Sequence, residues 1–231
     1  MNPKELSPQE VEALYRRLAD RIPDPKTELA FVNPYTLLVA VVLSAQATDV
    51  SVNLATRDLF RTVTTPQAMI AYGGERLRET IKTIGLFNTK AKNVIVLSHM
   101  LVAQHGGEVP EDRDALMALP GVGRKTANVV MNTAFGAETF AVDTHIFRVC
   151  NRTGLAPGKD VLAVELRLDA ATPPPYRRDA HHLLILHGRY VCKARLPECW
   201  RCVIADICRY QPKTPPPVDG KQVKLPRAAA E

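Results

Sequence analysis

The 231-residue sequence lacks any long hydrophobic run. Its longest apolar stretch, Thr36 to Ala47, is too short to span a bilayer and is expected to form a buried helix. The amino-terminus, Met-Asn-Pro-Lys-Glu, is polar and has none of the features of a secretory signal. These absences exclude a transmembrane protein and predict a cytoplasmic one that makes no contact with a membrane.

Strand patterns are nearly absent too, and no segment repeats at a fixed period. Helix signals take their place, beginning with the capping box Ser7-Pro8-Gln9-Glu10 and apolar residues at helical spacing after it. Many helices joined by short loops are typical of an all-α protein. We expect helices over residues 8–22, from 34 onward, 49–63, from 66 onward, 75–83, 88–104, 110–120, 124–135, 143–153, 160–171 and 176–190.

The composition is that of an ordinary globular protein, with 46% hydrophobic and 23% charged residues. The length allows one large domain or two modest ones. A net charge of +6 mildly favours a polyanionic partner.

Five cysteines without a secretory signal argue against a disulfide framework. Four of them follow the spacing C-x6-C-x2-C-x5-C, which indicates a metal site in a segment that has too few apolar residues to fold by burial alone. Structural zinc usually uses two short C-x2-C pairs, and only one occurs here, so an iron–sulfur cluster is favoured while zinc stays open. The fifth, Cys150, is expected to be a small buried hydrophobe. The four candidate ligands are Cys192, Cys199, Cys202 and Cys208.

The wide gap between the first two of these cysteines contains Lys193 and Arg195. Two cations on a loop fixed at both ends could contact phosphates. A solvated basic loop is an equally good interpretation.

The stretch Leu119 to Ala127 has two glycines, Gly121 and Gly123, around Val122, and the basic pair Arg124-Lys125 then opens a helix. Glycine permits a tight turn and close approach to a ligand, and the free N–H groups of a helix start attract anions. Eighteen residues after Lys125, Asp143 stands at the start of another helix. Lys125 and Asp143 are therefore candidates for one active site.

Together these residues resemble the endonuclease III family, the DNA glycosylases and abasic-site lyases of the helix-hairpin-helix superfamily. The similarity covers about residues 5–212 in sequence order. A helix-hairpin-helix turn alone is weak support, because it also occurs as a passive phosphate clamp. The further matching stretches are Leu43 to Asp49, Thr83 to Asn88, Ala141 to Asn151, His181 to Tyr190 and the four-cysteine spacing.

The resemblance implies two all-α lobes with DNA in the cleft between them. A six-helix barrel lobe would span residues 27–136, and residues 1–26 with 137–213 would form a lobe carrying a [4Fe-4S] cluster. Residues 214–231, rich in proline and alanine, are expected to be a disordered tail. The implied partner is double-stranded DNA with oxidised pyrimidines or abasic sites, bound by a monomer that is nucleoid-associated if the source is prokaryotic.

Lys125 matches the catalytic lysine of the family, which attacks the sugar C1′, expels the damaged base and cuts the strand by β-elimination from a Schiff base. The attacking amine must be neutral, whereas the reference pKa of lysine is about 10.4. The helix dipole and the neighbouring Arg124 both disfavour the ammonium form. The alternative is a lysine that only contacts phosphate.

Asp143 matches the catalytic aspartate, whose carboxylate would stabilise the oxocarbenium charge and help the amine to lose its proton. It can also be a helix N-cap, and the two roles are compatible. His145 would contact phosphate or satisfy a polar group in the core. Gln46 and Leu86 match the residues that fill the space left by a flipped nucleotide; otherwise they would be a helix-end polar residue and a core residue. Phe87 departs from the tyrosine common in the family.

Three other interpretations compete. A mismatch-type adenine glycosylase shares the cluster but typically lacks the lysine and carries an extra C-terminal domain. A non-catalytic helix-hairpin-helix module would leave Asp143 and the lesion-probing pair without a role. A redox protein built on the cluster would leave the hairpin unexplained, and no flavin motif is apparent.

Overall fold

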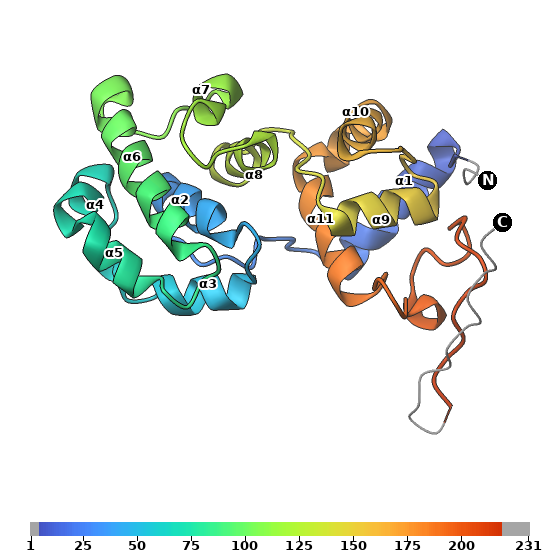
Figure 1. Cartoon of the computed structure of the whole chain (residues 1–231). Coiled ribbons are helices and arrows are strands. Elements are labelled where there is room, and N and C mark those ends of the chain that lie inside the picture. The colour runs from blue at the N-terminus through green and yellow to red at the C-terminus, as the bar shows by residue number, and fades with distance from the viewer. Residues whose placement is uncertain (1–4, 219–231) are drawn as a thin grey trace. The chain divides into compact units, whose positions relative to one another are not determined.

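The computed structural model describes residues 5–218, which form helices and turns and contain no β-strand, so the all-α prediction is confirmed. The chain divides into two compact units (Figure 1). One is the continuous stretch Thr27–Ala141, and the other combines the chain up to Lys26 with the chain from Val142 onward. Each helix within the described residues is too short or too polar to traverse a lipid bilayer.

The unit Thr27–Ala141 is organised around one helix that is apolar on all sides. Every residue from Tyr35 to Leu43 in this helix, α2, is buried, as expected of a helix enclosed by others. It contacts α3, α6 and α8, and Figure 1 shows it in the middle of the unit. The helices are α2 (Pro34–Ser44), α3 (Asp49–Thr56), η1 (Leu59–Arg61), α4 (Pro66–Tyr72), α5 (Gly74–Thr80), α6 (Phe87–His105), α7 (Arg113–Met117) and α8 (Arg124–Phe135).

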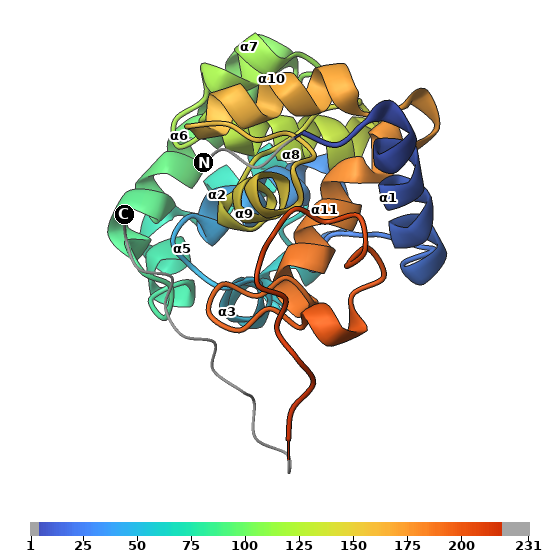
Figure 2. The same cartoon turned by 90° about the vertical axis from the view of Figure 1, so that its right-hand side faces the viewer.

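In the second unit α11 packs against α9 and α1 (Figure 2). The Tyr15 ring on α1 stacks on Tyr176 with 5.5 Å between centroids, and its hydroxyl is 2.9 Å from Thr172 Oγ1. Arg209 pairs with Glu10 at 2.6 Å and so ties the cysteine segment to α1. The elements are α1 (Pro8–Arg21), α9 (Thr144–Thr153), α10 (Val161–Ala171), η2 (Pro174–Tyr176), α11 (Arg177–Tyr190) and η3 (Cys199–Arg201).

Several helices differ from the sequence prediction at their ends, among them the one expected over residues 75–83, which ends at Thr80. The helix expected over residues 49–63 stops at Thr56, because the chain must turn for Leu59 and Phe60 to reach the core. The helix expected over 110–120 is confined to Arg113–Met117, with Asp112 as its cap. The helix expected from Asn88 begins one residue earlier, after a left-handed Leu86.

The boundary between the units falls at Ala141 and not at the expected residue 136. The reason is a set of hydrogen bonds from α8: Asn128 Nδ2 donates to Phe140 O at 3.0 Å, and Asn132 Nδ2 donates to Ala137 O at 2.9 Å. At the other end, Thr214 of the expected tail is buried. The part of that tail from residue 219 lies outside the described residues.

Candidate active site

The turn between α7 and α8 is built on glycine for two separate reasons. Gly121 has φ of 81°, a conformation that favours glycine, and a Cβ there would lie only 2.9 Å from Asn93 Nδ2. A Cβ at Gly123 would meet nothing within 4 Å. Glycine at this second position therefore keeps the backbone open to an approaching ligand. Between them Val122 is buried and anchors the turn, with its N–H donating to Leu119 O at 3.1 Å.

The start of α8 is an anion-attracting helix end that carries the candidate nucleophile. Gly123 is the N-cap residue, and no side chain caps the helix. First-turn N–H groups together with the helix dipole favour a negatively charged ligand. Lys125 lies exposed in this first turn, next to the half-buried Arg124. This combination places a primary amine beside a phosphate-binding backbone.

Gln46 and Leu86 are the two non-glycine residues within 5–218 that have positive φ, at 55° and 60°. A left-handed backbone costs a residue with a side chain about 1–2 kcal/mol. A Cβ built at Gly85 would lie 3.9 Å from Gln46 O, so the two turns adjoin each other. Leu86 is 59% exposed, which excludes the alternative that it is a core residue. Strain held at two adjoining exposed turns is typical of functional positions.

Leu86→Gly is expected to make the protein more stable and less active. Removing about 1–2 kcal/mol of strain, less about 0.5–1 kcal/mol for the freer unfolded chain, should raise the unfolding free energy by roughly 0.5–1 kcal/mol. Loss of the side chain should lower base removal from duplex DNA at least about tenfold, because nothing then fills the vacated space. Denaturant unfolding and single-turnover base release measure the two effects. Leu86→Ala should show the loss of activity without the gain in stability; equal unfolding free energies for the two variants would contradict the strain.

Asp143 is the N-cap of α9, as one of the two sequence interpretations predicted. Its Oδ1 accepts from the N–H groups of His145 and Ile146 at 2.8 and 2.9 Å. Its Oδ2 lies 3.0 Å from Nδ1 of His145, whose side chain is one-third exposed. The Asp143 side chain is only 10% exposed. The cap thus fixes the position of the carboxylate.

Sequence reasoning missed the residues that tie α8 to the segment leading to Asp143. Asn128 is 1% exposed, its Nδ2 donates to Phe140 O, and its backbone O accepts from Thr139 Oγ1 at 2.7 Å. Asn128 is one helical turn after Lys125, and Phe140 is three residues before Asp143. A buried asparagine inside an apolar helix pattern was the available signal. Together with the bond from Asn132 to Ala137 O, these contacts fix the segment between Lys125 and Asp143 against α8.

The four candidate cysteine ligands line one cavity, together with Thr153 and His187 and with apolar residues that include Ile204. The volume of this cavity is about 20 Å³. Burial raises the pKa of the Cys202 thiol to about 11 and also raises the pKa of Cys192. Thiolates here therefore need a compensating cation.

Residues 5–218 contain no group of three His, Cys, Asp or Glu side chains that could hold one metal ion. Four thiols around a common cavity with apolar walls nevertheless fit the donor set of a cluster, in which each cysteine ligates its own iron. Cys150 is fully buried on α9 and does not line this cavity, as the sequence predicted.

Two arginines of α9, also missed from the sequence, hold the loop between Cys192 and Cys199. Arg148 Nε donates to Cys192 O at 2.9 Å. Arg152 donates to Lys193 O and Ala194 O, each at 2.7 Å, and its guanidinium lies 4.6 Å from the centre of the Tyr210 ring. Both arginines thus hold the loop through its backbone carbonyl groups, and these contacts do not depend on the side chains of the loop.

Glu198 changes the charge of this loop. It is buried and pairs with Lys193 at 2.6 Å and with Arg201, and the hydrogen bond from Lys193 lowers the pKa of its carboxyl group. Arg195 is exposed and has no partner among the described residues. Arg195 is therefore the more available of the two predicted phosphate contacts.

The predicted site residues fall into both units. Lys125, the hairpin glycines, Gln46 and Leu86 belong to Thr27–Ala141. The unit that resumes at Val142 contains Asp143, His145 and the cysteine segment. The structure brings together Gln46 with the Leu86 turn, Asp143 with His145, and the four cysteines with one another.

Comparison with known proteins identifies the relatives of this chain. Residues 39–174 match the family model described as HhH-GPD superfamily base excision DNA repair protein. The chain is 60% identical to endonuclease III of Escherichia coli K12 and 58% identical to that of Haemophilus influenzae, in each case over 85% of this chain and 93% of the relative.

Solved structures give the same result. One titled as a trapped endonuclease III–DNA covalent intermediate superposes with a TM-score of 0.82 at 46% identity, covering 88% of this chain and 96% of that one. A non-covalent endonuclease III–DNA complex matches equally well, at 47% identity. A thermostable thymine-DNA glycosylase, at 24% identity and a TM-score of 0.79, shares the fold.

These relatives identify a DNA-binding repair enzyme, a DNA glycosylase and abasic-site lyase, and do not favour an adenine-specific or non-catalytic alternative. With the helix-hairpin-helix turn and an all-helical fold already in place, the chain belongs to the endonuclease III family within the HhH-GPD superfamily of base excision DNA repair proteins.

Proposed function

We propose that this protein removes oxidised pyrimidines from double-stranded DNA and cleaves the resulting abasic site through Lys125. One observation carries the proposal: an exposed lysine occupies the first turn of an uncapped helix, directly after a phosphate-binding turn. The test is reduction with borohydride in the presence of DNA that contains thymine glycol or an abasic site. A covalent protein–DNA complex is expected, and a protein that binds such DNA without ever being trapped would overturn the lyase assignment.

In the first step the neutral amine of Lys125 attacks C1′ of the damaged nucleotide. A C–N bond forms, the glycosidic bond breaks, and its electron pair leaves with the base, which takes up a proton. Asp143 stabilises the positive charge that develops on the sugar and accepts the proton that the amine must lose. Its capping hydrogen bonds hold the carboxylate in place during this step.

In the second step the sugar ring opens and a Schiff base forms between Lys125 and C1′. Loss of a proton from C2′ is followed by breakage of the bond to the 3′ phosphate oxygen, which leaves as the phosphate. Water then hydrolyses the Schiff base and releases the free amine of Lys125. Each step moves electron pairs together with protons, and none requires an oxidant or a reductant.

Gln46 and Leu86 keep the damaged nucleotide out of the stack. Extruding a nucleotide costs a few kcal/mol, and side chains that occupy the vacated space offset that cost. Both residues are exposed on left-handed turns that adjoin each other. Their strained backbone presents both side chains to the DNA before it binds, so little ordering is needed on binding.

The backbone of the DNA is held by the hairpin and the cysteine loop. The N–H groups of Gly121, Gly123 and Arg124 bind one phosphate, while that of Val122 donates to Leu119 O. Arg195 and Lys193 contact another stretch. His145 lies close enough to Asp143 to orient its carboxylate, at 3.0 Å. We expect a monomer that is associated with the nucleoid if the source is prokaryotic.

The four cysteines that line the cavity are proposed to hold a [4Fe-4S] cluster. The residues fit it through four thiols, apolar walls and the arginines that hold the loop backbone. Bound there, the cluster supplies a covalent cross-link that organises residues 192–208 and positions Arg195. It supplies no electron to the lyase steps.

The purified protein is expected to be yellow-brown and to contain iron and acid-labile sulfide in equal amounts. Cys199→Ala should lose most of that iron, because one ligand is removed. Cys150→Ala should keep it, because Cys150 lies outside the cavity. Metal analysis and visible absorbance of the three proteins give the result; a colourless protein that contains zinc would contradict the cluster.

A further inference from the structure

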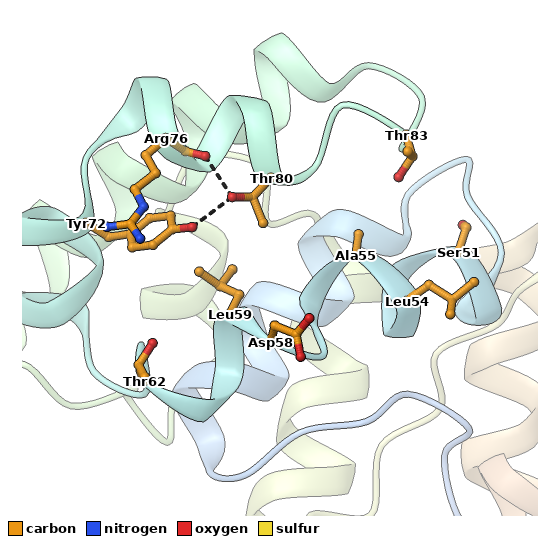
Figure 3. Close-up of a pocket in the computed structure, with 10 residues that line it drawn as sticks. All are labelled: Ser51, Leu54, Ala55, Asp58, Leu59, Thr62, Tyr72, Arg76, Thr80 and Thr83. Carbon is orange, nitrogen blue, oxygen red and sulfur yellow. Dashed lines mark hydrogen bonds between the residues drawn. The ribbon is translucent and has the colours of Figure 1, made fainter.

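A groove on the unit Thr27–Ala141 is separate from the hairpin turn and the cysteine segment. It lies between α3 and the α4–α5 pair and has a volume of about 660 Å³ (Figure 3). Its lining is rich in hydroxyl groups and includes one arginine and one carboxylate. The polar residues are Ser51, Asp58, Thr62, Tyr72, Arg76, Thr80 and Thr83.

Arg76 is the positively charged residue of this groove that has no ion-pair partner within residues 5–218. Its guanidinium lies over the Tyr72 ring, 4.4 Å from the centroid, and the residue is exposed. No carboxylate within residues 5–218 forms an ion pair with it, whereas Arg78, two residues along the same helix, pairs with Glu75 at 2.9 Å. An arginine stacked on a tyrosine keeps its N–H groups directed sideways, free to bind an oxyanion.

Hydrogen bonds fix the platform beneath Arg76 (Figure 3). Thr80 Oγ1 donates to Arg76 O at 2.8 Å and lies 2.8 Å from the Tyr72 hydroxyl. Since the threonine has a single proton and gives it to the carbonyl, the tyrosine hydroxyl must donate to Thr80. Arg76 is therefore held by its own backbone and by a fixed ring, at little entropic cost on binding.

The groove begins beside the two lesion-probing turns. Thr83 is three residues before Leu86, and Ser51, whose Oγ donates to Thr48 O at 2.7 Å, is five residues after Gln46. DNA that contacts Gln46 and Leu86 has its backbone at the open end of this groove.

We propose that the groove binds the sugar–phosphate backbone beside the lesion, with Arg76 as a direct phosphate ligand and the hydroxyls of Thr62 and Thr83 as further donors. We base this on the proposed function, which brings DNA to Gln46 and Leu86. The carboxylate of Asp58 does not oppose it strongly, because Arg57 and Arg61 lie 3.5 Å from its oxygens.

The salt dependence of DNA binding tests this assignment. Arg76→Gln is expected to weaken binding of a duplex with an uncleavable abasic-site analogue roughly tenfold. The slope of log K against log salt should become shallower by about 0.9, the value of one lost phosphate contact. Arg78→Gln removes the same charge from the same helix and should change the slope far less, because Arg78 already pairs with Glu75.

Tyr72→Leu provides a second variant that keeps the arginine and removes its platform. It should give a smaller loss of affinity at an unchanged slope, because the charge remains but is no longer preorganised. Equal slopes for Arg76→Gln and Arg78→Gln would overturn the phosphate assignment and leave an acidic protein segment as the occupant. Borohydride trapping of the wild type is scored separately: if it fails, the proposed function fails, and if it succeeds while the two slopes agree, only the groove assignment fails.

Discussion

Lys125→Gln is expected to abolish borohydride trapping and to lower base removal from DNA at least about 10³-fold, since the reaction loses its nucleophile. Glutamine keeps length and polarity at an exposed position of the first turn of α8, so folding should not suffer. The measurement is a denaturing gel of protein incubated with abasic DNA and borohydride. Binding to an uncleavable abasic analogue should persist at weakened affinity, because the hairpin backbone remains.

A matched control is available on the same unit. Lys92 is an exposed lysine on α6 to which we assign no part in the chemistry. Lys92→Gln makes the same chemical change and should be trapped like the wild type. If both variants lost trapping, the loss would come from removing a positive charge and not from removing the nucleophile. If neither variant lost trapping, another amine would be the nucleophile.

Asp143→Asn is expected to lower single-turnover base release about 10²-fold or more with little change in stability. Asparagine caps a helix as well as aspartate does, so the bonds to the N–H groups of His145 and Ile146 can be kept. The negative charge that stabilises the sugar cation and takes the proton is lost. This one variant therefore separates stability from activity. Thermal unfolding should show unchanged stability, and single-turnover base release should show the loss of activity.

Alanine at position 143 should lose both the helix cap and the catalytic carboxylate. Asp143→Ala removes the cap and should cost about 1 kcal/mol of unfolding free energy in addition to activity. Asp160 caps α10 in the same way, with its Oδ1 2.9 Å from Ala163 N, and has no part in the proposed chemistry. Asp160→Ala should cost similar stability and keep full activity. An Asp143→Asn protein as active as the wild type would reduce Asp143 to a cap.

Stability and function oppose each other at the lesion-probing turns. Gln46 and Leu86 keep a costly backbone at exposed positions, where no packing rewards it. Glycine would remove the strain and with it the side chain that we propose enters the DNA. The unfolding free energy given up at these two positions is thus a measure of what nucleotide extrusion requires.

Local chemistry made much of the fold readable from the sequence. The caps at Ser7 and Asp143 depend on the residue itself and on neighbours within one turn, so they form as the sequence predicted. The start of α8 at Arg124 follows equally from the glycines before it. The helix expected over residues 49–63 broke at Thr56, because burial of Leu59 and Phe60 outweighs local helix propensity.

The sequence by itself determined the family, the all-helical class, the helix-hairpin-helix turn and the candidate catalytic pair, because these are set by residue type and spacing along the chain. Only the tertiary structure decided which distant groups meet. It joined Gln46 to the Leu86 turn, Asn128 to Phe140 and Arg152 to the cysteine loop, and it left Arg76 on Tyr72 without a carboxylate. The physical reason is that partners far apart in the chain are selected by packing of the whole unit, and no local pattern records which of them will lie within a few ångströms of each other.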